Sequence, residues 1–133
     1  MKYLFDTNAC IRYINGRAPN LRERIRTVSD TDIVISAVTK YEMTYGAARS
    51  EYPERSREKH AAFFSRFISL PFDDAAAEIC GNIRAQLANA GTPIGPYDLQ
   101  IAAIALVHNL IVVTHNTVEF GRVPGLQMED WEV

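Results

Sequence analysis

The sequence predicts an α/β fold in which helices cover both faces of one short parallel sheet. Three short apolar segments, at residues 3–5, 33–35 and 111–113, are separated by stretches with helical periodicity. Strands that are apolar on both faces are typical of parallel sheets buried between helices. The chain has 133 residues, the length of one ordinary domain, and no linker or repeat divides it. We therefore expect residues 1–133 to form a single α/β/α sandwich.

The first half of the chain alternates strand and helix patterns. The expected elements are a strand at residues 2–5, helices at 7–14 and 19–28, a strand at 33–35 and a helix at 38–48. Gly16 ends the first helix, because glycine is favoured just past a helix end. The β-branched residues of segment 33–35 favour a strand.

The second half is mostly helical. The expected elements are helices at residues 53–69, 74–91 and 97–107, a strand at 111–113 and a last short strand at 126–128. Pro53 suits the first turn of a helix, and Pro71 ends the same helix. The helix at 97–107 is almost wholly apolar and must be buried on most of its sides.

Four acidic residues lie near the expected carboxyl ends of the strands, where ligands of parallel sheets usually bind. Asp6 follows the first strand directly, and Glu42 lies early in the helix after the second strand. Asp98 lies in the first turn of the apolar helix, and Glu119 lies in the loop after the strand at 111–113. Taken singly, each has an ordinary alternative, such as capping a helix for Asp6 or a solvated surface position for Glu42 and Glu119.

Several carboxylates in one crevice repel one another, and a divalent cation usually relieves that repulsion. Mg²⁺ and Mn²⁺ prefer oxygen ligands and keep several of their waters, so one or two direct carboxylates are enough. Asn8, Thr114 and Asn116 lie beside the same strand ends and provide polar neighbours for such waters. The sequence therefore predicts a Mg²⁺ or Mn²⁺ site.

The overall charge shows no basic bias, because 14 Lys and Arg face 16 Asp and Glu, a net charge of −2. Without the four proposed site acids, 12 acids face 14 bases, about +2, so the net charge does not argue against RNA. Cys10 and Cys80 fit two reduced thiols. No apolar run reaches membrane-spanning length. We expect a cytoplasmic protein that does not enter a membrane.

Five segments, in order along the whole chain, resemble the PIN-domain ribonucleases, and specifically the VapC toxins of bacterial toxin–antitoxin pairs. These segments are YLFDTN at residues 3–8, SAVTKYEM at 36–43, GPYDLQIAA at 95–103, VTHNTVEF at 113–120 and VPGLQMEDW at 123–131. The aspartate–threonine–asparagine of the first segment is weak evidence alone. Several ordered motifs spanning a domain are specific.

The resemblance assigns roles to the acidic residues. It implies that Asp6 and Asp98 are the principal metal ligands, that Glu42 completes the acidic set and that Glu119 is the fourth acid. Many PIN domains have aspartate where this chain has Asn116 or Glu119, and Asn116 is suited to orienting a metal-bound water. Either Glu42 or Glu119 then positions or deprotonates the attacking water.

The resemblance also implies the reaction and the partners. VapC-like proteins are endoribonucleases that leave a 5′-phosphate and a 3′-hydroxyl, form homodimers and are neutralised by a VapB-type antitoxin. Residues 94–131 look most like the VapC subgroup that cuts initiator tRNA in its anticodon loop. Candidate contacts to RNA phosphates are the basic residues Arg12, Arg17, Arg22, Arg24, Arg26, Arg49, Arg55, Arg57 and Lys59; alternatively, most of them are solvated helix residues or contact the antitoxin.

Two alternatives of another class are open at this point. A phosphoacceptor receiver module is also an α/β domain with an acidic Mg²⁺ pocket. It needs an acidic pair after the first strand and a lysine after a late strand, whereas Thr7 follows Asp6 here and Thr114 follows Val113. A PIN-like protein without catalytic activity, serving only to bind an antitoxin, is the second alternative.

Overall fold

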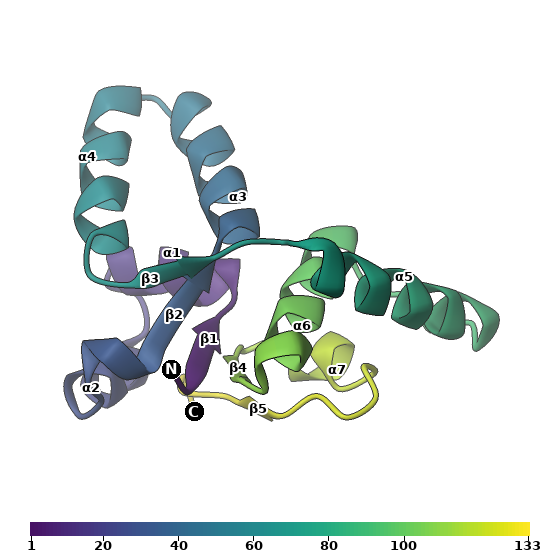
Figure 1. Ribbon diagram of the computed structural model, residues 1–133. Coiled ribbons are helices and arrows are strands. Elements are labelled where there is room, and N and C mark those ends of the chain that lie inside the picture. Colours follow the sequence, from purple (N-terminus) through teal and green to yellow (C-terminus); the bar gives the residue numbers. More distant parts are fainter.

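The computed structural model describes residues 1–133 and contains one parallel sheet of five strands in the order β3-β2-β1-β4-β5 (Figure 1). The strands are β1 (Tyr3–Phe5), β2 (Ile33–Ser36), β3 (Ile68–Leu70), β4 (Ile111–Val113) and β5 (Met128–Glu129). Leu4 of β1 pairs with Val34 on one side and with Val112 on the other. Because all pairs are parallel, the carboxyl ends of the three central strands lie side by side.

Helices pack on both faces of the sheet. They are α1 (Thr7–Ile14), α2 (Pro19–Arg26), α3 (Ala37–Ala48), α4 (Pro53–Phe64), α5 (Asp74–Asn89), α6 (Pro96–His108) and α7 (Thr117–Phe120), with a 3₁₀ turn at Asp30–Asp32. Helices α3 and α4 stand side by side and project from the sheet, while α5 extends from the opposite side (Figure 1).

Alternation along the strands divides the interior into two apolar cores. Leu4, Val34 and Val112 face the core formed with α5, α6 and α7. Tyr3 and Phe5 face the other core, which includes residues of α1, α2, α3 and α4. Strands of a parallel sheet that contribute to both cores must be apolar on both faces, as the sequence indicated. The predicted α/β/α sandwich is confirmed.

Two details of the sequence prediction are wrong at the edges of the sheet. The helix expected over residues 53–69 ends at Phe64, and Ile68–Leu70 forms β3 instead. Residues 68–70 hydrogen-bond in parallel to Val34–Ser36 of β2, so a contact distant in sequence decides their conformation. The final strand is Met128–Glu129, slightly later than the expected 126–128, because it pairs with Val112 and Val113 of β4.

The structure also corrects the expected position of Glu119. It lies in the single-turn helix α7 rather than in a loop. Phe120, in the same turn, is fully buried in the core beneath α6 and anchors that turn. Both cysteines are free thiols, and none of the helices has the length and hydropathy needed to cross a bilayer.

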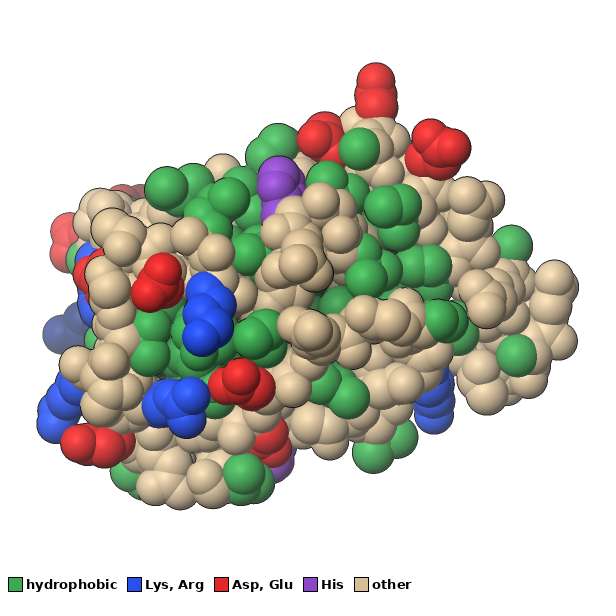
Figure 2. Space-filling model, turned by 60° about the horizontal axis from the view of Figure 1, so that its bottom comes forward, with side chains coloured by type: hydrophobic (Ala, Val, Ile, Leu, Met, Phe, Trp, Pro, Cys, Tyr) green, Lys and Arg blue, Asp and Glu red, His purple; other side chains and the backbone are tan.

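Charged side chains of both signs are intermingled on the face shown in Figure 2. Two of the arginines considered as RNA contacts pair with acids near the carboxyl terminus. Arg24 contacts Glu129 at 3.4 Å, and Arg12 is paired with Glu132. These two arginines therefore hold the carboxyl-terminal segment against α1 and α2.

Trp131 should be a main anchor of that segment. Its ring is 4% exposed and makes edge contacts with Tyr3 and Phe5, at centroid distances of 4.8 and 5.4 Å. We expect Trp131→Ala to lower the free energy of unfolding by about 3–5 kcal/mol, measured by urea denaturation. The control Val118→Ala, at a side chain that is 73% exposed, should change it by less than about 0.5 kcal/mol. Equal effects of the two substitutions would contradict this role for Trp131.

Candidate active site

Asp6 is buried at the carboxyl end of β1, and its two carboxylate oxygens have fixed partners. Oδ1 accepts a hydrogen bond from the backbone N–H of Ala9 at 2.8 Å, which caps α1. Oδ2 accepts from the hydroxyl of Thr114 at 2.7 Å, and Thr114 itself accepts from the N–H of Asn116. Asp6 therefore caps a helix, as its ordinary alternative predicted, and also contributes a carboxylate to the crevice.

Glu42 is held by a chain of hydroxyl groups that starts at the end of β2. Ser36 donates to Thr39 at 3.3 Å, and Thr39 lies 3.0 Å from the Thr7 hydroxyl. Thr7 in turn donates to Oε1 of Glu42 at 2.7 Å. Because Ser36, Thr39 and Thr7 are all buried, the chain fixes Glu42 relative to the first turns of both α1 and α3.

The side-chain amide of Asn116 holds Glu119 and lies near Asp98. The amide nitrogen donates to Oε2 of Glu119 at 2.7 Å, and the Asn116 side chain opposes the rise in the pKa of Asp98. Asn116 follows β4 closely, whereas Asp98 is in the first turn of α6 and Glu119 in α7.

The four carboxylates are close enough to influence one another. Burial raises the pKa of Asp6 to about 6, and the charges of Asp98 and Glu132 add to the effect, while hydrogen bonds from Thr114 and Ala9 oppose it. Burial also raises the pKa of Asp98 to about 6, and the charges of Glu119 and Glu42 raise it further. The charge of Asp98 thus interacts with the charges of Asp6, Glu42 and Glu119, and we call the region of these four acids the acidic crevice.

None of these four carboxylates forms an ion pair with a lysine, an arginine or a histidine. Their oxygens, with the hydroxyl and amide groups around them, form an all-oxygen donor set that suits Mg²⁺ or Mn²⁺. The acids do not form a tight cluster of three or more His, Cys, Asp or Glu ligands. Mg²⁺ commonly keeps several waters and needs only one or two carboxylates, so the donor set fits such an ion.

The other polar residues expected near the site differ in their positions. Thr114 and Asn116 contact the acids directly, whereas Asn8 is exposed and its side chain forms no hydrogen bond within the protein. The sequence prediction missed Thr7 and Thr39, which hold Glu42. The position of Thr7 next to Asp6 could have indicated that Thr7 belongs to the site, but nothing local in the sequence linked Thr39 to Glu42.

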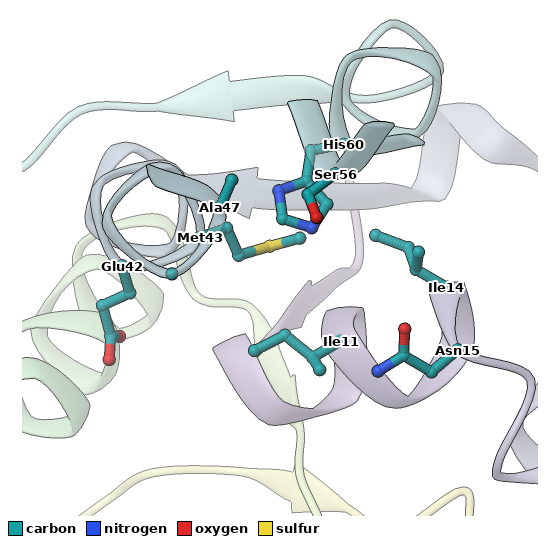
Figure 3. A pocket seen from close by; sticks show the side chains of 9 residues that line it. Ile11, Ile14, Asn15, Glu42, Met43, Ala47, Ser56 and His60 are labelled. Atoms are coloured by element: carbon teal, nitrogen blue, oxygen red, sulfur yellow. The ribbon is translucent and has the colours of Figure 1, made fainter. Parts of the chain in front are cut away.

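A cavity of about 240 Å³ lies between α1, α3 and α4 (Figure 3). Met43 and Ile11 project into it, and His60 and Ser56 of α4 line its opposite side. Glu42 points away from these residues, toward α6. Glu42 is the one proposed site acid among the residues that line this cavity.

Comparison with known families identifies the class of protein. The sequence matches the PIN domain family over residues 3–126, nearly the whole chain. The parallel sheet and the acidic crevice at its carboxyl edge agree with that match. The chain belongs to the PIN-domain family.

Curated relatives narrow the assignment. The chain is 44% identical over 131 residues to the tRNA(fMet)-specific endonuclease VapC of Salmonella typhimurium, and the alignment covers 98% of each chain. It is 45% identical over 131 residues to the protein of the same name from Shigella flexneri, again with 98% of each covered, and 38% identical to Ribonuclease VapC2 of Haemophilus influenzae. Within the PIN-domain family, the chain is one of the VapC ribonucleases.

Solved structures agree with the assignment of the chain to the VapC ribonucleases. The chain is similar to a chain in the crystal structure of DNA-bound VapBC from Salmonella typhimurium, with a TM-score of 0.93, 44% identity and 98% of each chain covered. It is also similar to a chain of VapBC2 from Rickettsia felis bound to a promoter DNA fragment, with a TM-score of 0.91, 32% identity and 98 and 99% of the two chains covered. The family resemblance found in the sequence is confirmed, and the receiver-module alternative is excluded.

The raised pKa values of Asp6 and Asp98 predict a specific pH dependence of stability. Each carboxyl has a pKa of about 6 in the folded protein, against an ordinary 3.8, so the folded state binds protons more readily than the unfolded state between those values. Ionisation of these two groups therefore destabilises the fold as pH rises from about 4 to about 6. The stability difference between the Asp98→Asn variant and the wild type should consequently increase in favour of the variant over that range.

Urea denaturation at several pH values between 4 and 7, in the absence of divalent metal, measures this difference. The control is Glu58→Gln, at an exposed carboxylate of α4 that forms no ion pair. Its difference from the wild type should change little across the same range. If the difference in free energy of unfolding between Asp98→Asn and the wild type stays constant or shrinks as pH rises, Asp98 does not have a raised pKa in the folded protein.

Proposed function

We propose that this protein is a divalent-metal-dependent endoribonuclease whose active site is the acidic crevice. The observation that carries the proposal is the convergence of four carboxylates, without any cationic partner, at the carboxyl ends of the central strands. We assign Asp6 and Asp98 as the metal ligands, with Glu42 and Glu119 completing the acidic set. Membership of the VapC ribonucleases supports RNA as the substrate.

Hydrogen bonds from the surrounding groups orient the acids for binding a cation. Thr114 and the Ala9 N–H fix the orientation of Asp6, and each of its oxygens keeps a lone pair free for a metal or for a metal-bound water. Asn116 holds Glu119 by a hydrogen bond of 2.7 Å and lies near Asp98. When bound, Mg²⁺ or Mn²⁺ lowers the pKa of a coordinated water and stabilises negative charge on the phosphate.

The protein residues then handle the proton. In hydrolysis the water oxygen joins phosphorus, the bond from phosphorus to the 3′-oxygen breaks, and the 3′-oxygen gains a proton. A carboxylate accepts the proton that the water loses, and Glu42 and Glu119 are the two residues we propose for this role. Glu42 is fixed by Thr7 and Glu119 by Asn116, so each is held in one orientation while it acts. The products are a 5′-phosphate and a 3′-hydroxyl.

We further propose initiator tRNA, cut in its anticodon loop, as the substrate. Its support is the identity of 44 and 45% to relatives named as tRNA(fMet)-specific endonucleases, over nearly the full length of both. A VapB-type antitoxin is the proposed partner, because the similar solved structures are VapBC complexes. A single domain over residues 1–133, a homodimer and a cytoplasmic location belong to the same proposal, as the family resemblance implies.

Substitution of the proposed metal ligands should remove catalysis without unfolding the protein. We expect Asp6→Asn and Asp98→Asn each to lower the rate of Mg²⁺-dependent RNA cleavage by at least about 100-fold, because each removes a charged ligand. Cleavage of RNA by the purified proteins is the measurement, with circular dichroism as the check on folding. Chelation of the metal should stop wild-type cleavage, and added Mg²⁺ or Mn²⁺ should restore it.

A matched control is Asp74→Asn, an exposed aspartate in the first turn of α5, far along the chain from the crevice residues. This variant should cleave RNA at the wild-type rate. Unchanged cleavage by folded Asp98→Asn would refute the assignment of the site. A wild-type protein that cleaves no RNA in any divalent metal would favour the non-catalytic alternative.

Sequencing of RNA ends after a brief pulse of expression tests the substrate. We expect new 5′-phosphate ends concentrated in the anticodon loop of initiator tRNA, and no such ends when the Asp98→Asn variant is expressed. Cuts spread over messenger RNA with initiator tRNA intact would contradict the proposed substrate while leaving the ribonuclease assignment in place.

A further inference from the structure

Three exposed tyrosines lie around Glu42, one of the four proposed site acids. Tyr41 and Tyr45 are one turn apart on α3 and are 56 and 58% exposed, and Tyr97 in the first turn of α6 is 37% exposed. Together with Glu42 they line a hollow of about 500 Å³. We call Tyr41, Tyr45 and Tyr97 the tyrosine surface.

The tyrosine surface is built across two helices that are distant in sequence. The hydroxyl groups of Tyr41 and Tyr97 lie 3.0 Å apart, and their rings meet edge to face with centroids 5.3 Å apart at 84°. Tyr41 precedes Glu42 in the sequence, and Tyr97 precedes Asp98. The aromatic pair therefore joins the two helices that carry proposed site acids, and both rings remain open to solvent.

Arg49 lies next to Tyr45, at the carboxyl end of α3. The guanidinium carbon of Arg49 lies 5.9 Å from the centroid of the Tyr45 ring, and Nη1 of Arg49 donates to the Tyr45 hydroxyl at 3.4 Å. Arg49 follows Tyr45 by one helical turn, and no acidic side chain pairs with it. Its charge is free to meet an anion from solution.

We propose that the tyrosine surface and Arg49 bind unpaired nucleotides of the RNA next to the scissile phosphate, with bases against the tyrosine rings and a backbone phosphate at Arg49. The inference rests on the proposed ribonuclease function and names the residues that hold the RNA strand beside the acids. It assigns substrate binding to residues that take no part in the chemistry at the carboxylates.

The chemistry of this region favours a single strand over other occupants. Exposed aromatic rings stack on unpaired bases irrespective of sequence, whereas the bases of a duplex are already stacked and paired. An acidic crevice repels a polyanion, so affinity for RNA must come from neighbouring groups, and Arg49 is an unpaired cation beside the rings. Glu42 also lines the hollow, so a strand lying in it would contact one of the proposed site acids.

The test measures separately how base stacking and positive charge contribute to RNA binding, in an Asp98→Asn protein that is expected not to cleave RNA. Binding of a fluorescein-labelled, unstructured ten-nucleotide RNA is measured by anisotropy with Asp98→Asn protein, and the same RNA annealed to its complement is measured in parallel. Adding Tyr45→Ala should weaken binding of the single strand by about 5- to 100-fold, the usual effect of losing one stacked base, whereas Tyr45→Phe should stay within about twofold. The duplex should bind weakly and should not distinguish the variants.

Arg49→Gln should reduce the slope of log affinity against log salt by about 0.7, as expected for one lost phosphate contact with a single strand. The control is Tyr52→Ala, at a tyrosine that is 61% exposed but does not line the hollow, and it should bind like the parent protein. In the cleaving protein, Tyr45→Ala should raise KM for an RNA with an unpaired target loop and leave kcat nearly unchanged.

Two results would overturn the inference. One is single-strand binding by Tyr45→Ala equal to that of Tyr52→Ala. The other is a Tyr45→Ala protein whose oligomeric state changes, as measured by light scattering, while its RNA binding does not. That result would show that a second copy of the chain occupies this surface. In both cases wild-type cleavage of RNA would persist, whereas loss of metal-dependent cleavage by the wild type itself would instead overturn the proposed function.

Discussion

The parallel pairing of β1 with β4 is the constraint on which the candidate site depends. It aligns Phe5 with Val113, so the next residues, Asp6 and Thr114, emerge at the same edge of the sheet. The hydrogen bond of 2.7 Å between them fixes the orientation of the buried Asp6 carboxylate. Asn116, two residues further, holds Glu119 by a second hydrogen bond. One strand register thus positions two of the four acids.

The same arrangement is unfavourable for the protein by itself. Buried carboxylates that raise one another's pKa destabilise the fold when they ionise, and no internal cation relieves them. The rest of the structure offsets this cost through two well-packed cores, one on each face of the sheet. Such a conflict between stability and local charge is typical of functional sites. In the function proposed here, a bound divalent cation relieves the repulsion among these carboxylates.

Polar groups around the crevice divide into two sets with different tasks. The hydroxyls of Thr114 and Thr7 and the amide of Asn116 point inward and hold carboxylates. The hydroxyls of Tyr41 and Tyr97 instead contact each other at the rim, and the rings stay exposed. The proposed chemistry at the acids and the proposed contact with RNA therefore depend on different side chains.

The sequence by itself determined the sandwich, the order of its main elements and the identity of the acids, because apolar periodicity and strand-end positions are local properties. Asp6, directly after a buried strand, and Asp98, at the start of an apolar helix, were both visible in this way. Only the tertiary structure decided that residues 68–70 form a strand, since their partner is the distant β2. It alone revealed that Thr39 and Thr7 hold Glu42 and that Asn8 turns to solvent, because these depend on how separate helices pack.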